Sequence, residues 1–431
     1  MSWKEITIDS FLKERPDIIK PDQANSLNLK RIEKIDFSGN IFLADKTQTR
    51  TNMIIVKSGD LVISGINAEK GALAVYEGEE DVLATIHYSS YEFDTSIVDI
   101  EYFKWFLTSN VFMNILKEQV GGGIKTELKP KKFLPIKIKL PGIDLQRKIA
   151  KKINNVSKEI RTLKETTEEN YELISKLRQS ILQEAVQGKL VPQDLNDEPA
   201  SVLLEKIKEE KERLIKEKKI KKQKPLPPIT EDEIPYELPK GWEWVRLGEI
   251  TNYAFNESLK PEEIDSEEWV LELEDIEKDT SRLVQMITNK DRQSKSNKNR
   301  FYKGDVLYGK LRPYLKKVLV AHKDGVCSTE IIPFKGYCNI DSKYIMCYMK
   351  SPYTDEIVNS ITHGMSMPRL GTKNALQLLF PLPPLNEQKL IVQKVYQLMA
   401  LCDELAKNIE QSKKDSDLLL QSVLQKAFKE A

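Results

Sequence analysis

The 431-residue sequence has few of the residues on which most catalytic and metal-binding sites depend. Its three histidines stand far apart, and its four cysteines form no C-x-x-C pair, so no zinc-site spacing is present. It also lacks the G-x-x-x-x-G-K-[ST] phosphate loop and the G-x-S-x-G nucleophile elbow. These absences disfavour an ATP motor, a serine hydrolase and a zinc enzyme.

Two further enzyme classes lack their usual signatures. A methyltransferase would need a glycine-rich cofactor turn and an Asn/Asp-Pro-Pro-aromatic loop, whereas Leu382–Leu385 (LPPL) lacks the polar first residue. A nuclease would need carboxylates spaced to bind Mg²⁺. The segment Asn256–Asp279 carries eleven acidic residues without such a spacing, and we expect it to be a solvated surface.

Long hydrophobic runs are also missing. No apolar stretch approaches the roughly 18–20 residues that span a bilayer, and Met1–Ser10 is charged and mixed rather than signal-like. We expect Cys327, Cys338, Cys347 and Cys402 to be buried, reduced thiols, as in cytosolic proteins. The sequence therefore predicts a cytoplasmic protein with no membrane partner.

The net charge of +1 gives no overall basic signature, but the charge is unevenly distributed. Asn289–Arg300 carries five basic residues and one aspartate, and Gly309–Lys317 carries four basic residues and no acid. Because only the local face of a protein attracts a polyanion, a sum near zero is compatible with a basic surface.

A long internal repeat determines the expected architecture. Leu140–Val186 aligns without a gap on Leu382–Phe428 after a shift of 242 positions, and Gln146 falls on Gln388. Apolar residues recur in steps of four and three through both copies, which predicts two long coiled-coil helices of roughly 60 Å each. Polar residues interrupt the middle of each seam, namely Thr167 and Asn170 in the first copy and Ser412 and Ser416 in the second. Alternatively, tertiary contacts cover the seams and these polar residues face solvent.

The repeat divides the chain into two domain–helix copies. We expect mixed α/β domains at residues 1–145 and 241–385. Residues 146–240 should contain the first long helix, a charged helix at Asn196–Lys224 and a stiff, extended Pro-rich linker at Pro225–Pro239, and residues 386–431 the second long helix. The fold class is therefore α+β with a pseudo-twofold internal repeat.

Two kinds of glycine-bearing segment occupy matching places in the two copies. Ser58–Asp60 and Lys303–Asp305 should form tight turns between strands. Val120–Lys125 and Ile361–Met367 precede the last strand of each domain. Close approach of their backbone to another molecule and a plain strand connection are equally compatible with their sequences.

These repeated segments resemble the specificity subunit of type I restriction–modification systems, over essentially the whole chain. LPGIDLQRKI and LPPLNEQKLI are similar to the starts of that family's two conserved helices. The run from Gln179 to Glu217 and the following PLPPITEDEIPYELPKGWEWVRLGEI resemble its central conserved region. The resemblance implies two target-recognition domains, each recognising one half of a split double-stranded DNA site. It also implies that the two long helices pair antiparallel, separate the domains and set the spacer.

The resemblance further implies a set of partners. Two methyltransferase (M) subunits would bind the helices, and restriction (R) subunits would join that core. This chain would have no catalytic centre and no cofactor or metal of its own, because S-adenosylmethionine, ATP and Mg²⁺ would belong to the partner subunits.

The resemblance carries no base-contacting residues, so the candidates follow from chemistry alone. Lysines and arginines in loops near glycine are candidates for phosphate contacts, and Asn or Arg side chains can form paired bonds with adenine or guanine. The phosphate candidates are Arg50, Lys70, Lys125, Lys310, Arg312, Lys316, Lys317 and Arg369. The base candidates are Asn52, Asn67, Asn299 and Arg300. Each of them could instead be an ordinary surface residue.

Two other hypotheses remain open at this point. A coiled-coil adaptor that joins protein-binding domains would have no basic face on its folded domains. An enzyme with an unrecognised centre would have a deep pocket with converging carboxylates or a histidine pair.

Overall fold

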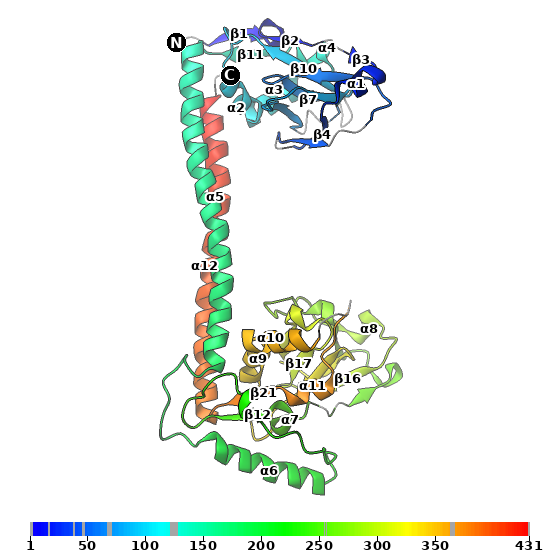
Figure 1. Cartoon of the computed structure of the whole chain (residues 1–431), viewed down its shortest axis with the longest axis vertical. Coiled ribbons are helices and arrows are strands. Elements are labelled where there is room, and N and C mark those ends of the chain that lie inside the picture. The colour runs from blue at the N-terminus through cyan, green and yellow to red at the C-terminus, as the bar shows by residue number, and fades with distance from the viewer. Residues whose placement is uncertain are drawn as a thin grey trace. The chain divides into compact units, whose positions relative to one another are not determined.

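The computed structural model describes residues 3–15, 18–37, 39–44, 48–66, 71–120, 128–253, 255, 257–362 and 367–429. Residue contacts divide the chain into two compact units, Met1–Glu169 with Ile409–Ala431, and Asn170–Asn408. Each unit contains one mixed α/β domain and parts of two long helices, α5 (Ile143–Val186) and α12 (Leu385–Ala427) (Figure 1). The predicted fold class, with two similar domains and two long helices, is confirmed.

The first domain is built from three small sheets and short helices. Strand β1 pairs antiparallel with β11, the order of the second sheet is β2-β10-β7-β8, and that of the third is β3-β6-β9-β4-β5. The strands are β1 (Lys4–Thr7), β2 (Leu12–Glu14), β3 (Ile18–Ile19), β4 (Arg31–Ile35), β5 (Ile41–Ala44), β6 (Met53–Val56), β7 (Leu61–Ser64), β8 (Leu73–Val75), β9 (Val82–Thr85), β10 (Tyr88–Phe93) and β11 (Lys137–Leu140). The helices are α1 (Pro21–Leu27), α2 (Ile100–Leu107), α3 (Asn110–Val120) and α4 (Pro130–Phe133).

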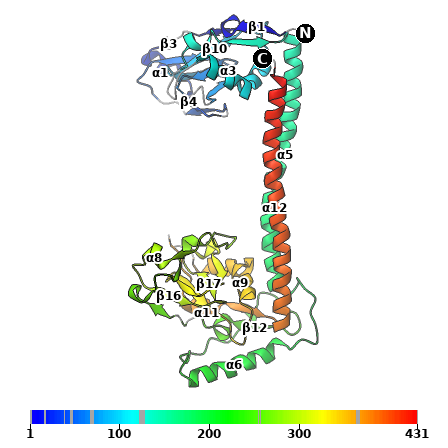
Figure 2. The same ribbon diagram turned by 180° about the vertical axis from the view of Figure 1, so that it is seen from behind.

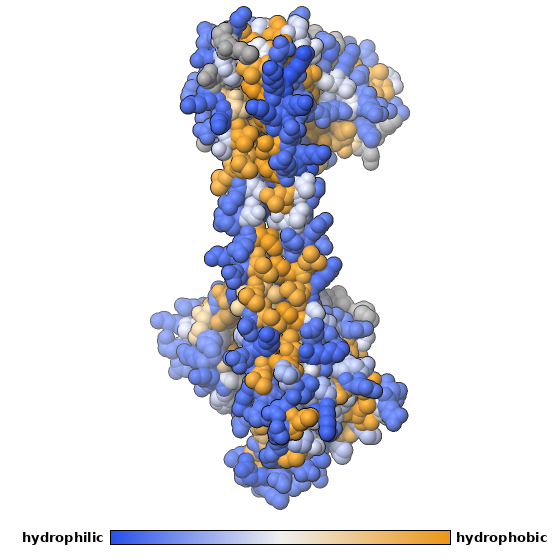
Figure 3. Space-filling view, turned by 90° about the vertical axis from the view of Figure 1, so that its left-hand side faces the viewer, coloured by the Kyte–Doolittle hydropathy of each residue, from blue (hydrophilic) through white to orange (hydrophobic). Residues whose placement is uncertain are grey.

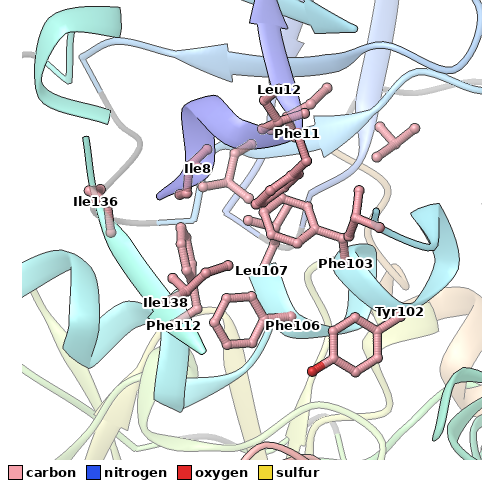
Figure 4. Close-up of a cluster of buried hydrophobic side chains, with 14 of the residues drawn as sticks. Ile8, Phe11, Leu12, Tyr102, Phe103, Phe106, Leu107, Phe112, Ile136 and Ile138 are labelled. Carbon is pink, nitrogen blue, oxygen red and sulfur yellow. The ribbon is translucent and has the colours of Figure 1, made fainter. Parts of the chain in front are cut away.

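An aromatic cluster forms the main core of this domain. Figure 4 shows Phe11, Phe103 and Phe106 packed together, and the Phe11 and Phe103 ring centroids lie 5.2 Å apart. The far end of α12 completes this core, because Phe428 is fully buried with its ring 5.3 Å from that of Tyr102. The first domain therefore depends on residues from the C-terminal end of the chain.

The second domain has the same strand plan in its described residues, except that no strand corresponds to β2. Strand β12 pairs with β21, the five-stranded sheet has the order β13-β16-β19-β14-β15, and the remaining strands form β18-β17-β20. The parallel pair lies at the same place in both five-stranded sheets, between β4 and β9 and between β14 and β19. The strands are β12 (Glu243–Arg246), β13 (Ser258–Leu259), β14 (Trp269–Leu271), β15 (Ile287–Thr288), β16 (Lys298–Phe301), β17 (Val306–Gly309), β18 (Val318–Val320), β19 (Gly325–Ser328), β20 (Ile331–Phe334) and β21 (Leu379–Leu382). The helices are α7 (Leu247–Ile250), α8 (Asn289–Arg292), α9 (Ser342–Lys350), α10 (Pro352–Ile361) and α11 (Thr372–Gln377).

The predicted Gly-Asp turns are present and are built alike. Gly59 and Gly304 have φ angles of 85° and 90°, a left-handed conformation in which a side chain would be strained. The carboxylates of Asp60 and Asp305 accept the backbone N–H groups of Lys57 and Tyr302 across these turns. The repeat found in the sequence thus extends to individual hydrogen bonds.

The two long helices run antiparallel and lie side by side in both views (Figures 1 and 2). In the first unit Lys164 forms an ion pair of 2.5 Å with Asp417, and in the second unit Arg178 forms one of 2.6 Å with Asp403. Because the residue number rises on α5 while it falls on α12, the pairing is antiparallel, as the resemblance implied.

Only one of the two predicted seam positions is buried throughout. On α5 every seventh residue is buried, and these residues are Gln146, Ile153, Ile160, Thr167, Ile174 and Ile181. The alternate seam positions of the middle section are about half exposed, as Leu163 (45%) and Leu177 (46%) show, and α12 repeats this at Leu405 (48%) and Leu419 (53%). Two helices alone therefore do not cover this apolar face.

The central region differs from the prediction in one respect. The charged helix α6 covers only Ala200–Lys216 and does not reach Lys224. Residues 218–224 are rich in lysine and offer no apolar stripe, so repulsion between like charges is not offset by packing. The Pro-rich linker that follows is bound to the second domain, because the buried Arg246 donates to the carbonyls of Pro227 and Pro228 and to Glu233.

Two smaller predictions concern the cysteines, expected to be buried, reduced thiols, and the apolar stretches, expected to be too short to span a bilayer. All four thiols are free, and Cys327, Cys347 and Cys402 are buried, but Cys338 is only half-buried and donates to Glu210. Among the described residues no helix has an apolar stretch long enough to cross a bilayer.

Candidate nucleic-acid interface

The basic run Asn289–Arg300 is largely neutralised inside its own domain. Arg292 forms two bonds of 2.8 Å with Asp275, which is fully buried, and Arg300 pairs with Glu268 at 2.5 Å. Lys298, itself buried, pairs with Glu272 at 3.2 Å. The expectation that the acidic segment is a solvated surface is therefore wrong for Glu268, Glu272 and Asp275, which bind these cations, whereas most of its other carboxylates are exposed.

These ion pairs bear on two candidate base contacts. Asn299 is buried and its amide donates to the Ile331 carbonyl at 3.0 Å, so its side chain serves the sheet. Arg300 is half-buried and engaged by Glu268. Their placement gives no support to a role in base recognition, which stays a prediction.

The segment Gly309–Lys317 is arranged differently, as an ordered loop in which Arg312 is exposed and the three lysines are half-buried. It contains the 3₁₀ turn η6 (Pro313–Leu315), flanked by Arg312 and Lys316 in the left-handed conformation, with φ angles of 50° and 49°. Side chains other than glycine and asparagine adopt this conformation at a cost of about 1 kcal/mol. Two such residues in one short loop indicate that the surrounding contacts impose its shape.

Those contacts bring the loop against a second candidate segment. Arg312 N–H donates to the Pro368 carbonyl at 2.8 Å, Leu370 N–H donates to the Lys310 carbonyl at 3.0 Å, and Leu311 bridges to Arg369. The structure thus brings Lys310, Arg312 and Arg369 together from two separate parts of the sequence.

The candidate cations of this domain differ in how they are engaged. Arg369 pairs with Glu330 at 3.0 Å, Lys316 pairs with Asp355 at 2.9 Å, and Lys317 donates to the Leu273 carbonyl at 2.7 Å. Within the described part of the chain, Lys310 and Arg312 form no ion pair, and Arg312 is exposed. These two are therefore the cations that remain available for a phosphate.

An aromatic residue on the same loop was missed by the sequence-based selection. Tyr314 follows Arg312 and Pro313 and is 45% exposed, which is unusual for a large ring in an ordered loop. An exposed ring beside an arginine can pack on a base or a thymine methyl group. The signal was present in GKLRPYLKK as an aromatic residue between basic ones.

In the first domain the described candidates are Arg50 and Asn52, both exposed on the segment that leads into β6. Thr49 anchors this segment, since its N–H donates to the Asn25 side chain at 2.8 Å and its carbonyl accepts from that side chain at 3.1 Å. Asn67, Lys70 and Lys125 lie outside the described residues.

The joints between domains and helices are built by one repeated, buried glutamine. Gln146 accepts the Asp99 N–H at 2.9 Å and donates to the carbonyls of Ile97 and Pro141. Gln388 accepts the Asp341 N–H at 2.9 Å and donates to the Pro383 carbonyl at 2.9 Å. Each domain is thereby bound firmly to the start of a long helix.

The described residues offer little to a catalytic centre. No group of three histidine, cysteine or acidic side chains in them could bind a metal ion. An open hollow of about 360 Å³ is lined by Glu272, Glu274, Arg292 and Lys298, but both carboxylates are paired with these cations. The hollow therefore holds no unpaired acid–base pair.

Comparison with known proteins identifies the class. Residues 239–412, which contain the second domain, its buried glutamine joint and the exposed loop, match the family described as type I restriction modification DNA specificity domain. The match covers less than half of the chain, and the resemblance of the chain to specificity subunits is confirmed.

Among individual relatives, the chain is 37% identical over 268 residues to the type I restriction enzyme EcoAI specificity subunit of Escherichia coli. The match covers 58% of this chain and 44% of that subunit, so the chain spans less than half the length of this relative.

Solved structures agree on the fold. A chain of a type I R-M system, described in terms of complex assembly and conformational transition, superposes with a TM-score of 0.65 at 16% identity, covering 99% of this chain and 97% of its own. The HsdS subunit from Thermoanaerobacter tengcongensis superposes with a TM-score of 0.55 at 15% identity, covering 99% and 96%.

Proposed function

We propose that this chain is the DNA-recognition subunit of a type I restriction–modification complex. Each α/β domain recognises one half of a bipartite, asymmetric double-stranded site, and the long helices set the spacer between the halves. The observation that carries the proposal is the doubled domain–helix joint at Gln146 and Gln388, in a chain whose second copy matches the DNA specificity family. The two half-sites should differ because the corresponding segments GINAEKG and GKLRPYL of the two domains differ in sequence.

The incompletely covered helix faces support a partner made of further helices. Leu173, Leu177, Leu401 and Leu405 are each about half exposed in the second unit, where α5 and α12 pair. Figure 3 shows an apolar band over the helix pair. An apolar face wider than two helices can cover is typical of bundles with more than two helices. We assign the apolar face of α5 and α12 to the binding of two methyltransferase subunits. Restriction subunits then join this complex.

In this proposal the chemistry belongs to the partners. The methyltransferase subunits use S-adenosylmethionine, and the restriction subunits use ATP and Mg²⁺. The chain itself orients the partners on the DNA, and its described residues contain no group of three histidine, cysteine or acidic side chains that could bind a metal ion. We propose that it acts in the cytoplasm, where the DNA and the partners are found.

Methylation-site sequencing tests the function directly. Cells that express this chain with its modification subunit should carry methyl groups at one sequence made of two unlike halves separated by a constant spacer. Methylation without such a motif, or none that depends on this chain, would favour a coiled-coil adaptor that does not bind DNA.

The loop that presents Arg312 provides a residue-level test. Replacing Arg312 by alanine should weaken target binding by about 1–3 kcal/mol, and only for the half recognised by the second domain. Arg282→Ala is the matched control, because Arg282 is exposed but paired with Glu277. Equal binding by wild type and by the Arg312→Ala/Lys310→Ala/Arg369→Ala variant would show that the DNA face lies elsewhere.

The apolar helix face provides a separate test of the partner assignment. Leu177→Glu/Leu405→Glu should fold, because both side chains are already half exposed, but should no longer co-purify with the modification subunit. Lys176→Glu/Glu404→Lys alters exposed neighbours on the same helices and should not affect assembly. Retention of the partner by the leucine variant would contradict the assignment.

A further inference from the structure

A strip of lysines in the central region has no part in the interface described above. Between the end of α6 and the Pro-rich linker, residues 216–224 contain six lysines and one acid, Glu217, which pairs with Lys219 at 2.7 Å. We call Lys218, Lys219, Lys221, Lys222 and Lys224 the lysine strip. All five are exposed, and apart from Lys219 none forms an ion pair with any described residue.

The strip has a defined course although it lacks regular secondary structure. At one end Lys218 adopts the left-handed conformation with φ of 57°, and Lys219 N–H closes the α6 terminus by donating to the Leu214 carbonyl at 2.9 Å. At the other end Leu226 packs beside Gly248, and Arg246 binds the two following proline carbonyls. Because both ends are bound to the second domain, less conformational entropy is lost when a ligand binds.

The strip is separate from the candidate recognition loop of the same domain. Helix α6 packs along α7, where Lys211 donates to the carbonyls of Gly248 and Glu249 at 3.3 and 3.0 Å. In both views α6 and β17, which leads into the recognition loop, lie on opposite sides of β12 (Figures 1 and 2). A ligand on the strip would therefore occupy a second surface.

We propose that the lysine strip is an auxiliary, sequence-independent binding site for the phosphate backbone of double-stranded DNA. Unpaired like charges about 3–7 Å apart along an extended chain lie within the screening length of about 8 Å and repel one another until a polyanion neutralises them. Protein partners usually bind through buried aromatic or aliphatic residues, whereas the apolar residues of this stretch, Ile220 and Leu226, are only half exposed and Leu226 packs inward.

The lysine strip lies within residues 187–240, between the first long helix and the second domain. The proposal of this second site goes beyond the proposed function. It rests on the proposed function only because it takes DNA as the ligand. The strip would bind a stretch of duplex other than the target and so favour retention of the complex on long DNA.

Salt-dependent binding of the full chain tests the proposal. The strip variant replaces the five strip lysines by glutamine, and the control replaces five exposed lysines of α5, namely Lys148, Lys151, Lys152, Lys158 and Lys176. Binding to a random duplex of about 40 base pairs is measured by anisotropy from about 50 to about 200 mM salt. The strip variant should reduce the slope of log K against log salt by up to about 4.5, with at least about tenfold weaker binding at low salt.

The outcomes separate this proposal from the proposed function. A strip variant whose slope and affinity match those of the control would overturn the strip as a DNA site while leaving target recognition intact. The proposal would also be overturned if the strip variant bound DNA as wild type does but lost a partner protein. The ligand of the strip would then be an acidic protein surface. If the wild-type chain shows no salt-dependent binding to the random duplex, the strip is likewise overturned, whereas the proposed function fails only if methylation-site sequencing finds no bipartite motif that depends on this chain.

Discussion

The ion pairs of the second domain show how a basic sequence can lack a basic surface. Asp275 is fully buried and accepts bonds from Arg292, from the Gln285 amide at 2.7 Å and from the Glu272 N–H at 2.8 Å. Four acceptor contacts satisfy a carboxylate that would otherwise be costly to bury. The pairing thus stabilises the domain and removes Arg292 from the cations available to a polyanion.

Removal of one partner of this pair should therefore be severe. Arg292→Met keeps the volume but leaves Asp275 buried without its counter-charge, and we expect a loss of about 3–5 kcal/mol in the free energy of unfolding of the second domain. Urea unfolding measures this loss. The matched double variant Arg292→Met/Asp275→Asn should lose less than Arg292→Met alone, because the uncompensated charge is gone. An additive double variant would contradict the account.

At the scale of elements, the seams and the joints of the long helices have different roles. In the middle of the seam, Thr167 and Ser416 are buried, and each hydroxyl donates to a carbonyl of its own helix four residues earlier, that of Leu163 or Ser412. These polar residues are thus satisfied without a partner helix, while Asn170 is exposed. At the joint, by contrast, Gln388 binds the Asp341 N–H and the Pro383 carbonyl, so the joint determines how the second domain is oriented on the start of α12.

Removal of the Gln388 side chain should lower the free energy of unfolding by more than one hydrogen bond is worth, because it leaves two backbone groups without a partner. Gln388→Ala leaves the Asp341 N–H and the Pro383 carbonyl without their partner, and we expect about 2–4 kcal/mol lower unfolding free energy for the second domain. Gln388→Glu should lose at least as much, because its carboxylate would be buried without a counter-charge and would face the Pro383 carbonyl. The exposed Gln393→Ala on the same helix is the control, and a Gln388→Ala variant as stable as this control would show that the joint contributes nothing.

At the scale of the whole molecule, each compact unit combines both halves of the sequence. The first unit buries Leu424 and Phe428 from the end of α12. In the second unit the end of α5 is buried at Ala185 and Val186, and the Tyr236 hydroxyl donates to the Val186 carbonyl at 3.0 Å. Each domain is therefore completed by the helix that begins in the other copy.

In the proposed function, the length of the two helices should therefore determine the spacer between the half-sites without altering which bases each domain recognises. Insertion of one heptad at matching points in the middle of both α5 and α12 keeps the buried seven-residue repeat and adds about 10 Å. We expect methylation-site sequencing to show a spacer longer by about three base pairs with both half-sites unchanged. An insertion of four residues in α5 alone breaks the register and should abolish activity. A changed base in either half-site would contradict this division between domains and helices.

The sequence by itself determined the repeat, the long helices and the Gly-Asp turns, because these follow from local periodicity and from residue types with few conformational options. It did not determine which charges are free. Asn289–Arg300 and Gly309–Lys317 are similarly basic in sequence, yet Glu268, Glu272 and Asp275 bind three cations of the first run, whereas Arg312 of the second run is exposed at a left-handed position beside η6. The tertiary structure alone decided this difference, because an ion pair depends on which strands become neighbours and not on how many charges a segment contains.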